Sequence, residues 1–204
     1  AFWRAVCFTL SRIASGFFLA AVSGVLLAAV ASRYSRIREL LMPVMLTVKS
    51  VPVASFIILA LIWFSSANLS VLISFLMVLP IIYTSVLDGI RSVDRQLLEM
   101  AQVFRIPGLR VVRYIYVPQV MPFFYPACSV ALGMSWKAGA AAEVIGIPRG
   151  SIGERLQQAK VYLDTPDLSA WTLVIVAASL FFEKIVLLLV GRVARACSAM
   201  HAGR

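Results

Sequence analysis

Apolar residues fill long stretches of the chain that contain no charged side chain. These stretches cover residues 14–32, 50–87, 114–136 and 168–182. A transmembrane helix needs about 20 apolar residues to cross the hydrocarbon core, and the second stretch is nearly twice as long. It must therefore fold back on itself, and the polar residues 65–68 predict the turn.

This pattern predicts five membrane helices, at residues 13–32, 43–64, 69–88, 118–141 and 166–190. None of them shows the alternation of apolar and polar residues that a membrane β-strand requires. Backbone polar groups in lipid must be paired within their own segment, which favours helices. We therefore predict an all-α fold, a polytopic membrane helix bundle that forms one transmembrane domain over residues 1–204.

Composition supports this assignment, since 61% of the 204 residues are hydrophobic and only 14% are charged. The net charge is +10. Eleven arginines fall on one side of the predicted topology: Arg33, Arg36, Arg38, Arg91, Arg95, Arg105, Arg110, Arg113, Arg192, Arg195 and Arg204. Basic connectors face the cytoplasm in membrane proteins, so we place them there. Because they are divided among connectors, the charge does not indicate a nucleic-acid partner.

Residues 1–12 precede the first predicted span and would lie outside the cell in this orientation. The sequence starts with Ala1 and shows no cleavable signal pattern. A further span upstream would explain this arrangement.

The connector between the third and fourth predicted spans, about residues 91–117, is unusually polar. Asp94 is placed to cap a short helix whose apolar residues recur at helical spacing. We expect this helix to stop near Arg105, with Pro107 and Gly108 forming a break. A second short helix should follow, and Pro118 suits the first turn of the next span.

The residues alone leave two interpretations of this connector open. It could be an amphipathic pair lying on the bilayer, with its arginines held by anionic lipid. It could instead be a docking element that fits a groove on a soluble partner and transmits motion to the adjacent spans. Only the second interpretation explains a rigid Pro-Gly break.

The connector also contains a recognisable order of residues. Glu99-Met100-Ala101 is followed by three residues, Arg105, nine residues, and then residues 115–118, which read Ile-Tyr-Val-Pro. This order resembles the cytoplasmic signature of permease subunits of binding-protein-dependent ABC importers, Glu-Ala-Ala, three residues, Gly, nine residues, Ile, one residue, Leu-Pro. Arg105 stands where that signature has glycine, and we expect the pair Pro107-Gly108 to supply the turn instead.

The resemblance extends over nearly the whole chain. Residues 12–28, 49–64, 89–101 and 140–156 are similar to permeases of the nitrate/taurine/aliphatic-sulfonate group. It implies a type I ABC importer permease-like bundle in the inner or plasma membrane. Its implied partners are a second permease copy in a homodimer, a cytoplasmic ABC ATPase dimer that binds ATP and Mg, and an extracytoplasmic substrate-binding protein. No cofactor is expected on this chain itself.

The same resemblance implies that residues 94–108 form a coupling helix that meets the ATPase. The residues assigned to it are Asp94, Glu99, Met100, Ala101, Arg105, Pro107 and Gly108. Glu99 would pair with a basic group or cap backbone donors of the ATPase, or it is simply a solvated helix glutamate. Ala101 would allow the ATPase to approach closely.

Candidate pathway residues lie at the other end of the fourth predicted span. Gly139 belongs to a run of small residues that lines a pathway or a subunit interface, or packs within one subunit. Lys137 could attract an anionic substrate or extend to the outer interface. Glu143 could hold a gate by pairing across a dimer, or could be exposed outside. The two charged residues should not share a helix face.

The segment 142–165 is predicted to be an external, gate-like element. Residues 151–154 form a capping-box pattern that opens a short helix. Thr165 before Pro166 is placed to cap the last span. The segment could act as a gate or as a landing surface for the binding protein.

Other functions find little support in the sequence. No GxxxxGK[ST] phosphate loop is present, so the chain itself does not hydrolyse ATP. The sequence contains no cluster of metal ligands and no Ser/His/Asp arrangement that would indicate an enzyme. An ion-coupled secondary transporter would have to use Glu143 and Asp88. A pure scaffold subunit would not need a pathway-like span.

Overall fold

The computed structural model describes residues 2–199, and the side chains of residues 2–192. The tail residues Arg195 and Arg204 therefore lie outside the described side chains. The elements are α1 (Phe2–Arg33), α2 (Ser35–Ser50), α3 (Val53–Trp63), α4 (Ser66–Arg91), α5 (Arg95–Val103), α6 (Gly108–Val111), the π-helix η1 (Val112–Tyr116), α7 (Val117–Gly146), α8 (Ile152–Val161) and α9 (Thr165–Ala199). The predicted all-α fold is confirmed.

Within the described part of the chain, four helices are long and apolar enough to cross a membrane. They are α1, α4, the continuous helix Gly108–Gly146 and residues Thr165–Arg192 of α9. The pair α2 and α3 passes the same test as one bent span, which gives up to five. The chain is a multi-pass membrane protein.

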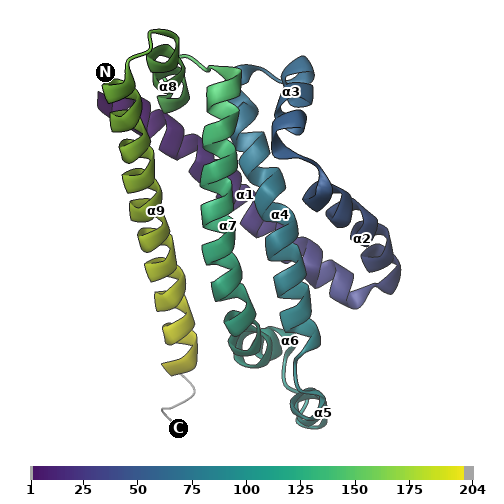
Figure 1. Cartoon of the computed structure of the whole chain (residues 1–204). Coiled ribbons are helices and arrows are strands. Elements are labelled where there is room, and N and C mark those ends of the chain that lie inside the picture. Colours follow the sequence, from purple (N-terminus) through teal and green to yellow (C-terminus); the bar gives the residue numbers. More distant parts are fainter. Residues whose placement is uncertain (1, 200–204) are drawn as a thin grey trace.

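Helices α4 and α7 run side by side, and α1 crosses them obliquely (Figure 1). Helix α9 follows α7 on one side, and α2 and α3 lie on the other. Helix α8 and the N-terminus lie at one end of the bundle, which we call the α8 end. Helices α5 and α6 lie at the opposite end, which we call the elbow end.

The three central helices meet at a crossing built from small residues. A Cβ added to Gly16 of α1 would lie closer than 3.0 Å to Val71 and Ser74 of α4. A Cβ on Gly139 of α7 would clash with the same Ser74, whose hydroxyl donates to the backbone oxygen of Ser135 at 3.1 Å. Small residues let helix backbones approach closely in a membrane. Among the alternatives open for Gly139, these contacts favour packing within one chain.

Burial separates the central helix from a peripheral one. Half of the most apolar window of α4, 50%, is buried within the chain, against 11% for the window of α9. Helix α4 is therefore packed within this chain to a much greater extent than α9 is. Most of the apolar surface of α9 is left for lipid or for another subunit.

The predicted span 43–64 is wrong as a single helix. The structure places helix α2 up to Ser50 and helix α3 from Val53, with a bend of 105° between them. Val51 and Pro52 are extended at this break. Proline disfavours the helical conformation of the residue before it, so hydropathy stays high while the helix ends.

The predicted separation of a short second helix from the span beginning at Pro118 is also wrong. The chain is helical without interruption from Gly108 to Gly146, and it passes through η1. Pro118 cannot donate to the backbone oxygen of Tyr114, and its ring crowds that carbonyl. The wider π turn relieves this conflict and lets the helix continue.

Two helix caps differ in detail from their predictions. The side chain of Asp164 caps α9 by accepting from the backbone N–H of Asp167 at 3.2 Å, a role we had predicted for Thr165. Ser151 caps α8 as predicted, and its hydroxyl accepts from the N–H of Glu154 at 3.0 Å. The Glu154 carboxylate returns to the N–H of Gly150, so the reciprocal bond of the capping box is shifted by one residue.

Candidate functional site: the elbow and the Glu143 cluster

The elbow consists of α5, the turn at residues 104–107, α6 and η1. Asp94 opens it as predicted, since its carboxylate accepts from the backbone N–H of Gln96 at 2.9 Å. The backbone N–H of Asp94 donates to the side chain of Gln119 in α7 at 3.0 Å. The start of α5 is therefore hydrogen-bonded directly to the long helix that it precedes.

A small apolar cluster holds the two arms of the elbow together. Val93, Ala101 and Ile115 are buried against one another, and Leu98 packs on the cluster. The spacing of the signature thus brings its alanine and its isoleucine into one contact. Ala101 is 3% exposed, so its small side chain permits close approach between α5 and η1 and is not presented to a partner.

Arg105 makes the turn that we had assigned to Pro107 and Gly108, and that assignment is wrong. Arg105 has a φ of 49°, in the left-handed region. Its N–H donates to the oxygen of Gln102 at 3.0 Å, and the N–H of Ile106 donates to the oxygen of Ala101 at 2.9 Å. This pair of bonds is the Schellman motif, in which glycine usually takes the left-handed position. Gly108 begins α6 instead.

Substitution of Arg105 tests this turn. Because a residue with a Cβ loses about 1 kcal/mol in the left-handed conformation, Arg105→Gly should retain or strengthen the turn. A β-branched residue fits that conformation poorly, so Arg105→Val should weaken it. We expect amide exchange at Ile106 to be about fivefold faster in Arg105→Val than in Arg105→Gly. Arg110→Val, in the helical conformation of α6, serves as the control, and equal rates in both Arg105 variants would contradict the assignment.

The outer side of the elbow is both charged and apolar. The assigned residues Asp94, Glu99, Met100, Arg105, Pro107 and Gly108 are all exposed. Between them lie Val103, Phe104 and Leu109, which are 79%, 72% and 88% exposed. A cavity of about 570 Å³ opens between α5 and η1. Contiguous exposed apolar surface rimmed by charge is typical of an interaction site.

Glu143 lies at the α8 end and is almost completely buried, at 1% exposed. Its Oε2 accepts from the Thr9 hydroxyl at 2.7 Å, and the Thr9 oxygen accepts from the backbone N–H of Ile152 at 3.1 Å. Arg12 and Ser70 face the same carboxylate. One side chain therefore joins α1, α4, α7 and α8. The interpretation of Glu143 as merely exposed is wrong, and pairing across a dimer stays a prediction.

The Glu143 cluster is not saturated with hydrogen bonds. Glu143 Oε1, Ser70 Oγ and one terminal nitrogen of Arg12 are buried without a hydrogen-bond partner in the described part of the chain. The guanidinium of Arg12 lies 4.3 Å from the ring centroid of Phe8. A buried polar atom without a hydrogen-bond partner destabilises the folded state. Small movements of these side chains should therefore have large effects on stability.

Helix α8 reaches this cluster through a glycine. A Cβ on Gly153 would lie closer than 3.0 Å to the backbone of Glu143. Only a residue without a side chain lets the first turn of α8 approach α7 this closely. The predicted external segment 142–165 is therefore held against the bundle at the N-terminal end of α8.

Lys137 points to a different side of α7, as predicted from helix rotation. It is exposed and lines a cavity of about 310 Å³ between α7 and α9, together with Glu183. Glu183 accepts from the Ser129 hydroxyl at 2.8 Å, so a partner of Glu183 lies on α7. Ionisable side chains at membrane depth face cavities or partner groups. A role of Lys137 in substrate movement stays a prediction.

Residues 20–198 match the family described as the binding-protein-dependent transport system inner membrane component. The chain belongs to this family. The match covers most of the chain, including the elbow and the Glu143 cluster, apart from Thr9 and Arg12.

Several transport permeases are similar to this inner membrane component. A taurine transport system permease protein of Escherichia coli is 26% identical over 89% of this chain and 66% of its own length. A bicarbonate transport system permease protein of Synechococcus elongatus is 22% identical over 71% of this chain and 52% of its own. A nitrate import permease protein of Synechococcus elongatus is 27% identical over 69% and 50%. The chain spans about half to two thirds of these relatives.

Most partners of Glu143 were not predicted from the sequence. Thr9 lies 134 residues away along the chain, and no local pattern connects them. Gly153 stood inside a recognised capping pattern, and a glycine within the first turn of a helix is a signal of close approach.

Proposed function

We propose that this chain is the transmembrane subunit of an ATP-driven importer, in which it forms the substrate pathway and receives the stroke of a cytoplasmic ATPase at the elbow. The observation that carries the proposal is the exposed surface of Glu99, Met100, Val103, Phe104 and Leu109. It lies at the elbow end, where α5 extends past the end of α4 (Figure 1). An apolar surface in this place is suited to a groove on a soluble partner.

The internal contacts of the elbow suit the transmission of force. The cluster of Val93, Ala101 and Ile115 joins α5 to η1, and Gln119 joins Asp94 to α7. A push on α5 would therefore move the first turns of the membrane helix that follows. ATP and Mg would be bound by the ATPase, and the chain itself would contribute no catalytic group.

The partners follow from this role. Two copies of the chain would surround one pathway, an ATPase dimer would bind the two elbows, and an extracytoplasmic protein would deliver the substrate. The arginine-rich elbow end would then face the cytoplasm of a bacterial inner membrane. The names of similar permeases mention taurine, bicarbonate and nitrate, which fits a small anionic solute and the exposed Lys137.

Co-purification with elbow variants tests the proposal. The tagged chain, isolated from its own membrane, should bring an ATPase and a substrate-binding protein with it, and the ligand of that protein identifies the cargo. Glu99→Arg and Val103→Asp should each lower ATPase recovery and uptake about tenfold, because the first reverses the charge at the proposed contact and the second places a charge in its apolar part. Glu39→Arg changes an acidic residue that is also exposed but lies outside the elbow, and it should have no effect.

The opposite result would favour an elbow that lies on the bilayer. In that arrangement Val103→Asp would release the elbow from lipid while the ATPase is still recovered in full. Unchanged recovery and unchanged uptake in both elbow variants would overturn the docking role.

A further inference from the structure

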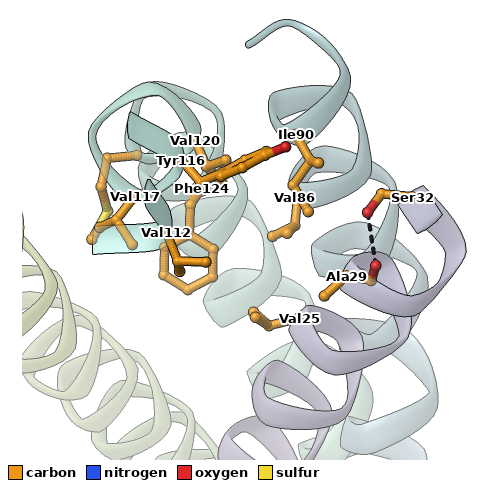
Figure 2. A pocket seen from close by; sticks show the side chains of 11 residues that line it. Val25, Ala29, Ser32, Val86, Ile90, Val112, Tyr116, Val117, Val120 and Phe124 are labelled. Carbon is orange, nitrogen blue, oxygen red and sulfur yellow. Dashed lines mark hydrogen bonds between the residues drawn. The ribbon is translucent and has the colours of Figure 1, made fainter. Parts of the chain in front are cut away.

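A second cavity lies at the elbow end, where α1 diverges from α4 and α7. Its volume is about 510 Å³. Figure 2 shows its three walls, formed by α1, by α4, and by η1 with the first turns of α7. Typical lining residues are Val25, Ala29, Val86, Ile90, Val112 and Phe124. We call this cavity the α1–η1 groove.

The walls of the α1–η1 groove offer very few polar atoms. Among the side chains that line it, hydroxyl groups come only from Ser32 and Tyr116. The Ser32 hydroxyl already donates to the backbone oxygen of Ala29 at 2.7 Å. A polar solute would lose its hydration here without finding partners, so the groove suits a hydrocarbon chain.

Each wall of the groove leads directly to an arginine. Arg33 follows Ser32 at the end of α1, Arg91 follows Ile90 at the end of α4, and Arg113 follows Val112 in η1. Arg33 and Arg91 are exposed. Adjacent residues are about 3.8 Å apart at Cα, and arginine side chains extend well beyond that, so the guanidinium groups can reach the mouth of the groove. Arg33, Arg91 and Arg113 therefore lie within reach of the mouth, although none of them lines the groove itself.

We propose that the α1–η1 groove binds an anionic phospholipid, with an acyl chain against its apolar walls and the phosphate near Arg33 and Arg91. The combination of an apolar slot with a basic mouth at the membrane boundary matches an amphiphile with an anionic head. The volume lies in the usual range for ligand sites, about 300–1,000 Å³. Arginine is suited to phosphate because its planar donors bind two oxygens at once.

Charge also disfavours a second copy of this chain that fills the groove with the same face. A copy inserted in the same orientation would bring its own Arg33, Arg91 and Arg113 to the same end of the bundle. Like charges would then face each other across the groove, which costs free energy in a partly desolvated site. A phospholipid supplies the opposite charge in the same place.

Lipid retention by the purified full chain tests the proposal. The assembled protein is first embedded in an equimolar mixture of phosphatidylglycerol and phosphatidylcholine. It is then released from this mixture, and the lipid that stays bound is counted by native mass spectrometry. We expect phosphatidylglycerol to be retained about tenfold more than phosphatidylcholine. Arg33→Gln combined with Arg91→Gln should remove this preference. Arg149→Gln combined with Lys160→Gln, at the α8 end, should leave it unchanged.

Filling the groove gives the second arm of the test. Ala29→Trp should lower retention of both lipids, whereas Leu26→Trp, on an exposed face of the same helix, should not. Thermal unfolding shows whether each variant is folded, and the smaller Ala29→Leu replaces any that is not. The proposal is overturned if the variant at Ala29 retains as much phosphatidylglycerol as the unchanged protein. It is also overturned if that variant keeps its lipid but loses a second copy of the protein. Lipid retention is measured without transport, so a negative result for the lipid site leaves the proposed importer role untouched.

Discussion

Replacing Gly153 by valine is expected to detach α8 from α7. A Cβ at this position would lie closer than 3.0 Å to the backbone of Glu143, and backbone atoms cannot move aside as a flexible side chain can. Overpacking of this kind costs about 3 kcal/mol. The Thr9 contact to Ile152 would break at the same time, because it depends on the same approach. We expect a lower thermal midpoint and rapid proteolysis within residues 147–165.

Gly133→Ala is the matched control for this prediction. Gly133 lies in α7 as well, and a Cβ there would meet no atom within 4 Å. Alanine is favoured over glycine inside a helix, so this variant should be unchanged or more stable by up to about 1 kcal/mol. A protein in which Gly153→Val and Gly133→Ala behave alike would show that α8 does not pack on α7 as described.

Removal of the Glu143 carboxylate should have the next largest effect. In Glu143→Ala the Thr9 hydroxyl loses its acceptor, and Arg12 and Ser70 lose the group that they face. Leaving buried polar groups unpaired costs about 1–3 kcal/mol, and the lost side chain adds a cavity. We expect a loss of about 3 kcal/mol, measured by thermal or denaturant unfolding. Glu143→Gln keeps an acceptor and should be milder.

A double-mutant cycle with Thr9→Val separates the direct contact from other losses. The two residues share one hydrogen bond. The loss of stability in the double variant should therefore differ from the sum of the two single losses by about 1 kcal/mol. Glu39→Ala removes an exposed carboxylate and should change stability by less than about 0.5 kcal/mol. Strict additivity of Thr9 and Glu143 would mean that the bond between them contributes nothing to the fold.

Features encoded within one helical turn were predictable from the sequence. Asp94 and Ser151 cap the helices that follow them, because a cap needs only its own side chain and the next few backbone groups. The charge-free runs located α4, α9 and the later part of α1 for a similar reason, since hydropathy is a sum over neighbouring residues. The predicted start of the first span at residue 13 is wrong, because α1 begins at Phe2. The turn between α3 and α4 lies at residues 64–65, so it overlaps the predicted turn 65–68 only at Ser65, and residues 66–68 already belong to α4.

Features decided by distant contacts or by backbone geometry were not predictable. Pro52 bends the second span without changing its hydropathy. Arg105 is held in the left-handed conformation while Ala101 packs on Ile115, and a rule based on residue type favours Gly108 for that turn. The Glu143 cluster depends on the way four helices pack, and no periodicity along one helix reports such a meeting.

The prolines of α7 have a mechanical consequence. Pro118, Pro122 and Pro126 recur every four residues, so one side of the first turns lacks three backbone donors. That side resists bending less than the rest of the helix, and Pro118 lines the cavity between α5 and η1. At the far end, Gly139 and Glu143 clamp the helix to its neighbours. A stroke applied to α5 should therefore appear as curvature in the first third of α7, while the remaining two thirds stay still.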